Sequence, residues 1–163
     1  MRYKCFCTYD GSDYCGWQRQ PKVRTVQGVI EEALKNIYLE PIAIYGASRT
    51  DKGVHGIGQV FHYDAEMEIP IERLSKVINR QLPPTIHILS VKEETSEFHS
   101  RFSCLGKEYT YRIETNPQKN VFMANYIYAY ERPLNLEVLN NWASYFIGTC
   151  DYRAFMASGS DKD

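Results

Sequence analysis

The sequence predicts an α+β fold: a ferredoxin-like split βαβ unit, with an antiparallel sheet and helices on one face, followed by an incomplete second unit of the same kind. Two observations predict it. Over residues 1–95, the periodic segments follow the order strand, helix, strand, strand, helix, strand. Residues 96–163 then contain only two strand-like segments before one amphipathic helix. We therefore expect two units, 1–95 and 96–163, with further chain or a partner completing the second.

The elements of the first unit follow from hydrophobic periodicity. Residues 2–9 alternate at period two, which is typical of a strand buried on one face. Apolar residues then recur at helical spacing up to Ile37, and the Thr25 side chain can cap that helix at its start. The remaining elements are expected at 42–45 (strand), 59–63 (strand), 70–82 (helix) and 86–91 (strand).

The second unit shows similar local signals. Residues 107–115 alternate strictly between apolar and polar side chains, which predicts a strand, and a second strand is expected at 126–130. Asn135 can cap a helix that ends at Gly148. Because these strands are too few to cover the helix, the chain as given is interpreted as a fragment.

Composition excludes several classes of protein. Hydrophobic residues make up 44% and charged residues 24%, as in soluble globular proteins, and the net charge of −1 does not favour a polyanion binder. No apolar run is long enough to span a membrane, and the N-terminus lacks a secretory signal, so we expect a cytoplasmic protein with no membrane partner. The five cysteines and four histidines lack metal-ligand spacing, and nucleotide-binding motifs are absent. The sequence predicts neither a metal nor a cofactor.

One connection is a candidate functional loop. Residues 46–58 join the second and third strands, where a tight hairpin needs only two residues. This loop is rich in glycine and contains Arg49, Asp51, Lys52 and His55. Long connections of this kind are often functional. The alternative is an Asp-Lys-Gly turn that caps its own backbone.

Three other segments suggest binding as well as structure. Tyr9–Gln20 mixes aromatic and hydrogen-bonding side chains in an expected loop, although its aromatics can equally cover the core. Arg24–Gln27 places a cation near a helix N-terminus, which is a natural phosphate site. Phe98–Ser103 precedes the strand that contains Tyr109.

These segments, in this order, resemble the TruA-type tRNA pseudouridine synthases. The resemblance rests on five blocks: Y-D-G-S-x-Y-x-G-W-Q-R-Q at 9–20, R-T-V-Q at 24–27, R-T-D-x-G-V-H at 49–55, F-H-x-R-F-S at 98–103 and K-E-Y-x-Y-R at 107–112. It implies the pseudouridine synthase fold, in which an active cleft lies between two ferredoxin-like halves. It also implies a homodimer that isomerises uridine in the anticodon stem-loop of tRNA.

The resemblance assigns roles to five residues. Asp51 matches the catalytic nucleophile, and Arg49 matches the arginine that orients or pairs with it. Tyr109 matches the aromatic that packs against the target uracil. Arg19 and Arg24 lie in segments that face the RNA backbone in relatives, which is a weaker assignment.

The chain also departs from the family pattern. Ser48 and Lys52 stand where many members have Gly and Ala, and their effect on substrate choice is open. The downstream basic residue that pairs with the catalytic aspartate has no counterpart before Asp163. The chain as given is therefore expected to lack a complete active site.

Other functions remain possible from the residues alone. The same split βαβ topology is used by RRM domains, so a non-catalytic RNA-binding module is the main alternative. The strand at 59–63 lacks the aromatic RNP1 pattern of those domains, which favours the enzyme. A small-molecule binding domain has no support beyond the fold. Without the resemblance, Tyr109, Tyr111 and Ile113 would be interpreted as one buried stripe.

Overall fold

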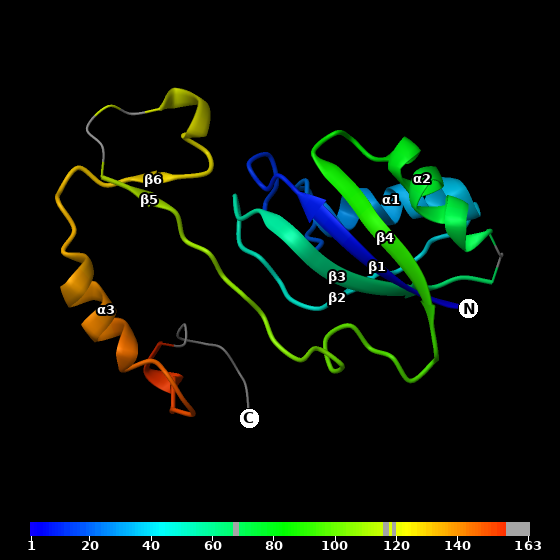
Figure 1. Ribbon diagram of the computed structural model, residues 1–163. Helices are drawn as coiled ribbons and strands as arrows, with labels where there is room; N and C mark the ends of the chain where they lie inside the picture. The colour runs from blue at the N-terminus through cyan, green and yellow to red at the C-terminus, as the bar shows by residue number, and fades with distance from the viewer. Residues whose placement is uncertain (67–68, 116–117, 119, 156–163) are drawn as a thin grey trace. The chain divides into compact units, whose positions relative to one another are not determined.

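The computed structural model describes residues 1–66, 69–115, 118 and 120–155, which form two compact units, Met1–Tyr109 and a unit that begins at Thr110 (Figure 1). The first unit contains β1 (Arg2–Tyr9), α1 (Val26–Tyr38), β2 (Tyr45–Gly46), β3 (Gly56–Asp64), α2 (Ile71–Gln81) and β4 (Ile86–Glu94). Residues 156–163 of the predicted second unit lie outside the described residues. In the described part of the chain, no helix combines the length and apolarity needed to cross a lipid bilayer.

The first unit is a mixed α+β structure with a four-stranded antiparallel sheet, as predicted. The strand order is β2-β3-β1-β4, and every neighbouring pair is antiparallel. Both helices lie on the same face of this sheet (Figure 1). The Thr25 hydroxyl accepts a hydrogen bond from Gly28 N at 3.3 Å, so the predicted cap of α1 is confirmed.

Strand β2 is shorter than predicted. Residues 42–45 were expected to be a strand, but only Tyr45 and Gly46 pair with β3. The backbone of Ile44 is instead hydrogen-bonded by the side chains of Gln27 and Glu31 from α1. Side chains of the helix therefore replace a strand partner at this position.

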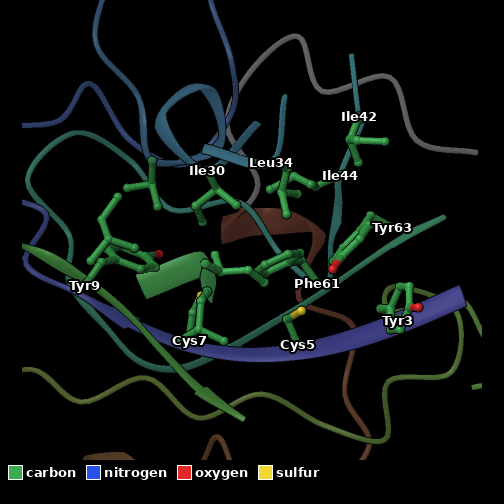
Figure 2. Close-up of a cluster of buried hydrophobic side chains, with 14 of the residues drawn as sticks. Tyr3, Cys5, Cys7, Tyr9, Ile30, Leu34, Ile42, Ile44, Phe61 and Tyr63 are labelled. Atoms are coloured by element: carbon green, nitrogen blue, oxygen red, sulfur yellow. The ribbon is translucent and has the colours of Figure 1, made fainter. Parts of the chain in front are cut away.

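The core lies between the sheet and its helices. Alternate residues of β1 are buried, namely Tyr3, Cys5, Cys7 and Tyr9, and Figure 2 shows them facing apolar side chains from α1 and β3. The two thiols share one face, as predicted, and burial raises the pKa of Cys7 to about 12. The thiols of β1 are therefore protonated packing groups. All five cysteines are free, and the described residues contain no cluster of metal-ligating side chains.

The opposite face of the sheet is partly covered by the segment Phe98–Ser100. Ser100 is buried, its N–H donates to His62 Nδ1 at 3.2 Å, and its hydroxyl donates to the carbonyl of Tyr45. The His62 ring stacks on Tyr45 with centroids 5.1 Å apart. Burial, then His99 and Arg2, lower the pKa of His62 to about 4. The neutral imidazole thus anchors this segment to β3.

This anchor makes unfolding pH-dependent. Above pH 6.5 His62 is neutral in both the folded and the unfolded chain; between pH 6.5 and about 4 only the unfolded chain takes up the proton. The free energy of unfolding should therefore fall as the pH is lowered through this window, by on the order of 3 kcal/mol. Urea titrations of wild type and His62→Asn at several pH values measure the difference. His87→Asn, at an exposed position of β4, is the control and should keep the wild-type slope.

The second unit contains less sheet than predicted. It has β5 (Ile113–Glu114) and β6 (Tyr128–Ala129), which pair in parallel, the short helices η1 (Val121–Met123) and η2 (Arg153–Phe155), and α3 (Leu136–Ser144). The predicted strands 107–115 and 126–130 are thus wrong in extent. A strand needs a hydrogen-bonded neighbour, and most of these residues have none among the described ones.

Helix α3 begins as predicted. Asn135 Oδ1 accepts a hydrogen bond from Val138 N at 3.1 Å, which confirms the cap. The helix ends at Ser144, earlier than the Gly148 expected from the sequence. No described residue from Thr110 onward is buried, so the apolar face of α3 is exposed.

Candidate active site

The candidate loop, residues 46–58, is held by the segment Tyr9–Gln20, which we call the cradle segment. Trp17 N donates to Thr50 O at 3.0 Å, and Gly53 N donates to Tyr14 O at 3.3 Å. The side chain of His55 fixes the far end of the loop, because its Nδ1 lies 3.1 Å from Gly11 N and 3.1 Å from Asp10 Oδ1. The ring can accept from the amide when neutral or donate to the carboxylate when charged. Two motifs separated in sequence therefore form one structure.

Glycines allow this close approach. A Cβ at Gly16 would lie 2.5 Å from Thr50 O, and one at Gly11 would lie 2.0 Å from Val54 O. Gly16 also has a φ of +83°, a left-handed conformation that side chains with a Cβ rarely adopt. The glycines of the cradle segment are thus required by contact with the loop.

Trp17 connects the cradle segment to the core. Its side chain is 1% exposed and packs between Tyr9 and Phe61, with ring centroids 5.8 and 6.1 Å away. A Cβ at Gly46 would lie 2.5 Å from Trp17 Nε1, so the indole rests on the start of the loop. The sequence left open whether the aromatic side chains of the cradle segment bind a partner or cover the core. Trp17 and Tyr14 are both buried, so these two side chains pack in the core.

Polar side chains lie beneath the loop. The Tyr9 hydroxyl is 2.9 Å from Thr50 Oγ1, and Gln59 Nε2 donates to Ser48 O at 2.9 Å. Burial raises the pKa of Tyr9, hydrogen bonds to Thr50 and Gln59 oppose this shift, and Cys7 and Tyr109 add to it. Tyr9 therefore stays a neutral phenol. These side chains are the loop base: Tyr9, Ser48, Thr50 and Gln59.

Asp51 follows Thr50 and is exposed. Its carbonyl accepts a hydrogen bond from Val54 N at 3.2 Å, which closes a turn around Lys52 and Gly53. The Asp51 carboxylate makes no hydrogen bond or ion pair with a residue that the structure describes. Arg49 is also exposed, and the two side chains are not ion-paired in the described chain. The loop thus presents both groups to solvent without joining them.

Arg19 and Arg24 have different surroundings. Arg19 Nη1 lies 3.1 Å from Glu31 Oε2, whose side chain is only 9% exposed. The Arg24 guanidinium lies 4.9 Å from the centre of the Tyr14 ring, and its charge remains exposed beside the start of α1. Arg19 is therefore ion-paired, whereas Arg24 forms no ion pair with a carboxylate in the described part of the chain.

Sequence reasoning missed a buried polar pair on α1. Gln27 and Glu31 lie four residues apart, so they share one face of the helix. Gln27 Nε2 donates to Glu31 Oε1 at 2.9 Å, Ile44 N donates to the same carboxylate oxygen at 3.2 Å, and Arg19 N donates to Gln27 Oε1 at 3.0 Å. The sequence signal that could have predicted this pair is two polar residues at helical spacing on an otherwise apolar face of the helix. The pair connects the cradle segment to Ile44, the residue before β2.

Tyr109 is the last residue of the first unit, and its side chain is 73% exposed. It also contributes, as the smallest of the named causes, to the raised pKa of Tyr9. The residues around it have no regular secondary structure, in contrast to the predicted strand. The exposed ring is available for stacking rather than packed in a core stripe.

The described residues therefore offer an exposed carboxylate on a braced loop, an exposed arginine two residues before it and an exposed aromatic ring at Tyr109. A carboxylate can act as a nucleophile or as a proton acceptor. An exposed aromatic ring can stack on an unpaired base. These groups suit nucleophilic or acid–base chemistry on a nucleotide. Chemistry of that kind requires no electron transfer.

Comparison with known proteins identifies the family of this chain. The family model for tRNA pseudouridine synthase matches residues 6–103, which include the cradle segment and the loop. The chain is 42% identical over 160 residues to tRNA pseudouridine synthase A of Oceanobacillus iheyensis, covering 98% of this chain and 63% of the relative. It is 41% identical over 157 residues to tRNA pseudouridine synthase A of Brevibacillus brevis, covering 96% and 64%.

A third relative is tRNA pseudouridine synthase A 1 of Bacillus cereus, which is 40% identical over 162 residues, covering 99% of this chain and 66% of the relative. The chain thus spans just under two thirds of the length of these curated relatives. The family model extends over more than half of the chain. The chain belongs to the tRNA pseudouridine synthase family.

Proposed function

We propose that the complete protein converts uridine to pseudouridine in tRNA, with Asp51 as the catalytic nucleophile. One observation carries this proposal: the Asp51 carboxylate stands exposed on a loop whose backbone is held at Thr50, Gly53 and Gly56. An exposed carboxylate on a fixed backbone can be aimed at a substrate without a large ordering cost. The names of the curated relatives support tRNA as the substrate.

The reaction requires no redox step. The N1–C1′ bond of uridine breaks, the uracil turns, and a C5–C1′ bond forms. The hydrogen on C5 leaves as a proton, and N1 gains a proton, so the product is an isomer of uridine. Asp51 would attack or accept a proton during this sequence. Arg49 would pair with this carboxylate and orient it once RNA fills the site. No side chain of this site needs a metal or cofactor for that role.

The target uridine must leave its stack to reach Asp51. Flipping a base costs a few kcal/mol, and stacking on an aromatic ring returns about 1–3 kcal/mol. The exposed ring of Tyr109 is suited to receive the uracil. We propose that the target lies in the anticodon stem-loop, as the resemblance implies.

We further propose that the first unit has the ferredoxin-like split βαβ arrangement. Its element order and its strand order β2-β3-β1-β4 support this topology. Residues 96–163 would begin a second unit of the same kind, with chain equivalent to the last third of the relatives completing its sheet and the cleft. A homodimer in the cytoplasm is part of the same proposal and rests on the resemblance.

The decisive experiment incubates the complete gene product with an unmodified tRNA transcript and maps pseudouridine at single-nucleotide resolution. We expect pseudouridine in the anticodon arm and none in a reaction without enzyme. Tight binding of tRNA with no pseudouridine would overturn the proposal and favour the alternative, a non-catalytic RNA-binding module. The mapped position also identifies the target.

Arg24 provides a separate test of RNA binding. Arg24→Ala should weaken tRNA binding and reduce the slope of log K against log salt by about 1, because one phosphate contact is lost. Filter binding of the complete protein at several salt concentrations measures both effects. Arg80→Ala, in the last turn of α2, removes the same charge outside the site and should leave the slope unchanged. Equal slopes for wild type and Arg24→Ala would remove Arg24 from the interface.

A further inference from the structure

The ring of Tyr9 is held by packing on two sides. It lies at the end of β1, opposite Gly56, where the register between β1 and β3 shifts. A Cβ at Gly56 would lie 2.4 Å from this ring, so the ring lies directly against the strand backbone. Trp17 packs from another direction, and the side chain of Tyr9 is 3% exposed. Such packing leaves the hydroxyl little freedom to move.

The hydroxyl contacts the residue next to the proposed nucleophile. Thr50 is held twice: Tyr9 Oη lies 2.9 Å from its Oγ1, and Trp17 N donates to its carbonyl at 3.0 Å. Asp51 is the next residue, so the direction of its Cα–Cβ bond depends on the backbone of Thr50. Register irregularities of the kind seen in β1 are common beside active sites, where they redirect a side chain.

We propose that the Tyr9 hydroxyl is a positioning group, which fixes Thr50 and thereby orients the Asp51 carboxylate toward the substrate. This inference rests on the proposed function. Tyr9 touches neither substrate nor reacting atoms in this role and acts through Thr50. Because burial keeps the phenol neutral, the contact is the same across the physiological pH range.

Tyr9→Phe tests the inference, because it removes the hydroxyl and keeps the packed ring. In the complete protein we expect kcat to fall about ten- to a hundredfold, as expected for a displaced catalytic group, with KM for tRNA unchanged. Thr50→Val should give a similar loss, and Thr50→Ser should recover most of it. The double variant Tyr9→Phe/Thr50→Val should be no slower than Tyr9→Phe alone, because the Tyr9–Thr50 contact is already lost in that single variant.

Tyr38→Phe is the matched control. The Tyr38 hydroxyl is 3.1 Å from that of Tyr63 in the same core, so this variant removes a phenol hydroxyl with a buried hydrogen bond that does not involve the loop. We expect a similar loss of thermal stability in both variants and wild-type kcat in Tyr38→Phe alone. A kcat for Tyr9→Phe equal to that of Tyr38→Phe would overturn the inference and leave the proposed function standing.

A second measurement does not depend on activity. The amide of Gly53 donates to Tyr14 O in the cradle segment, and the amide of Val54 donates to Asp51 O in the turn of the loop. If Tyr9 positions this backbone, their hydrogen exchange should accelerate about tenfold or more in Tyr9→Phe and stay at the wild-type rate in Tyr38→Phe. Unchanged exchange in Tyr9→Phe would overturn the positioning role, whether or not the wild-type protein forms pseudouridine. Failure of the wild-type protein to form pseudouridine would count only against the proposed function.

Discussion

Asp51→Asn should lower pseudouridine formation by at least about a thousandfold while tRNA binding stays nearly unchanged. The amide has almost the shape of the carboxylate, but it is a poor nucleophile and a poor proton acceptor. Because the Asp51 side chain makes no hydrogen bond or ion pair within the described chain, its replacement should not destabilise the loop. Single-turnover kinetics with saturating complete protein measure the chemical step directly.

The control for Asp51→Asn is Glu40→Gln. Glu40 is an exposed carboxylate just after α1, so this variant removes the same charge away from the loop. Its turnover and tRNA affinity should match those of the wild type. Substantial turnover by Asp51→Asn would show that another group performs the chemistry, and would remove the central residue of the proposed mechanism.

Gly16→Ala should destabilise the protein by roughly 2–5 kcal/mol and also reduce activity. A positive φ costs a residue with a Cβ about 1–2 kcal/mol, and overpacking against a fixed group adds about 1–3 kcal/mol. The group in the way is the carbonyl oxygen of Thr50, 2.5 Å from the added Cβ. Since this carbonyl precedes Asp51, its displacement should disturb the nucleophile as well. Urea unfolding of the complete protein measures the loss of stability.

Two other glycines separate the causes of that loss. Gly53 has a similar φ of +79°, but an added Cβ there meets nothing within 4 Å, so Gly53→Ala should show the conformational cost alone. Gly58→Ala has neither the positive φ nor a close neighbour and should be nearly neutral. If Gly16→Ala were no worse than Gly53→Ala, the close contact between the cradle segment and the loop would be refuted.

The fold of the first unit was accessible from local patterns. Period-two alternation in β1, helical spacing in α1 and the cap at Thr25 depend only on neighbours in sequence, and each was found where predicted. The strand over residues 107–115 was wrong because alternation indicates that a segment can form a strand. It does not show that a partner is present to accept its hydrogen bonds.

The sequence by itself determined the family, through five ordered blocks, and the position of the candidate carboxylate at Asp51. Only the tertiary structure decided how that carboxylate is supported. The Tyr9–Thr50 contact spans 41 residues of sequence. The glycines of the cradle segment are required because a Cβ there would clash with the backbone of residues 46–58, which follow α1 in the sequence. The pairing of Arg19 with Glu31 likewise required coordinates. Such contacts depend on how distant segments pack, and no periodicity within one segment encodes the identity of its partner in space.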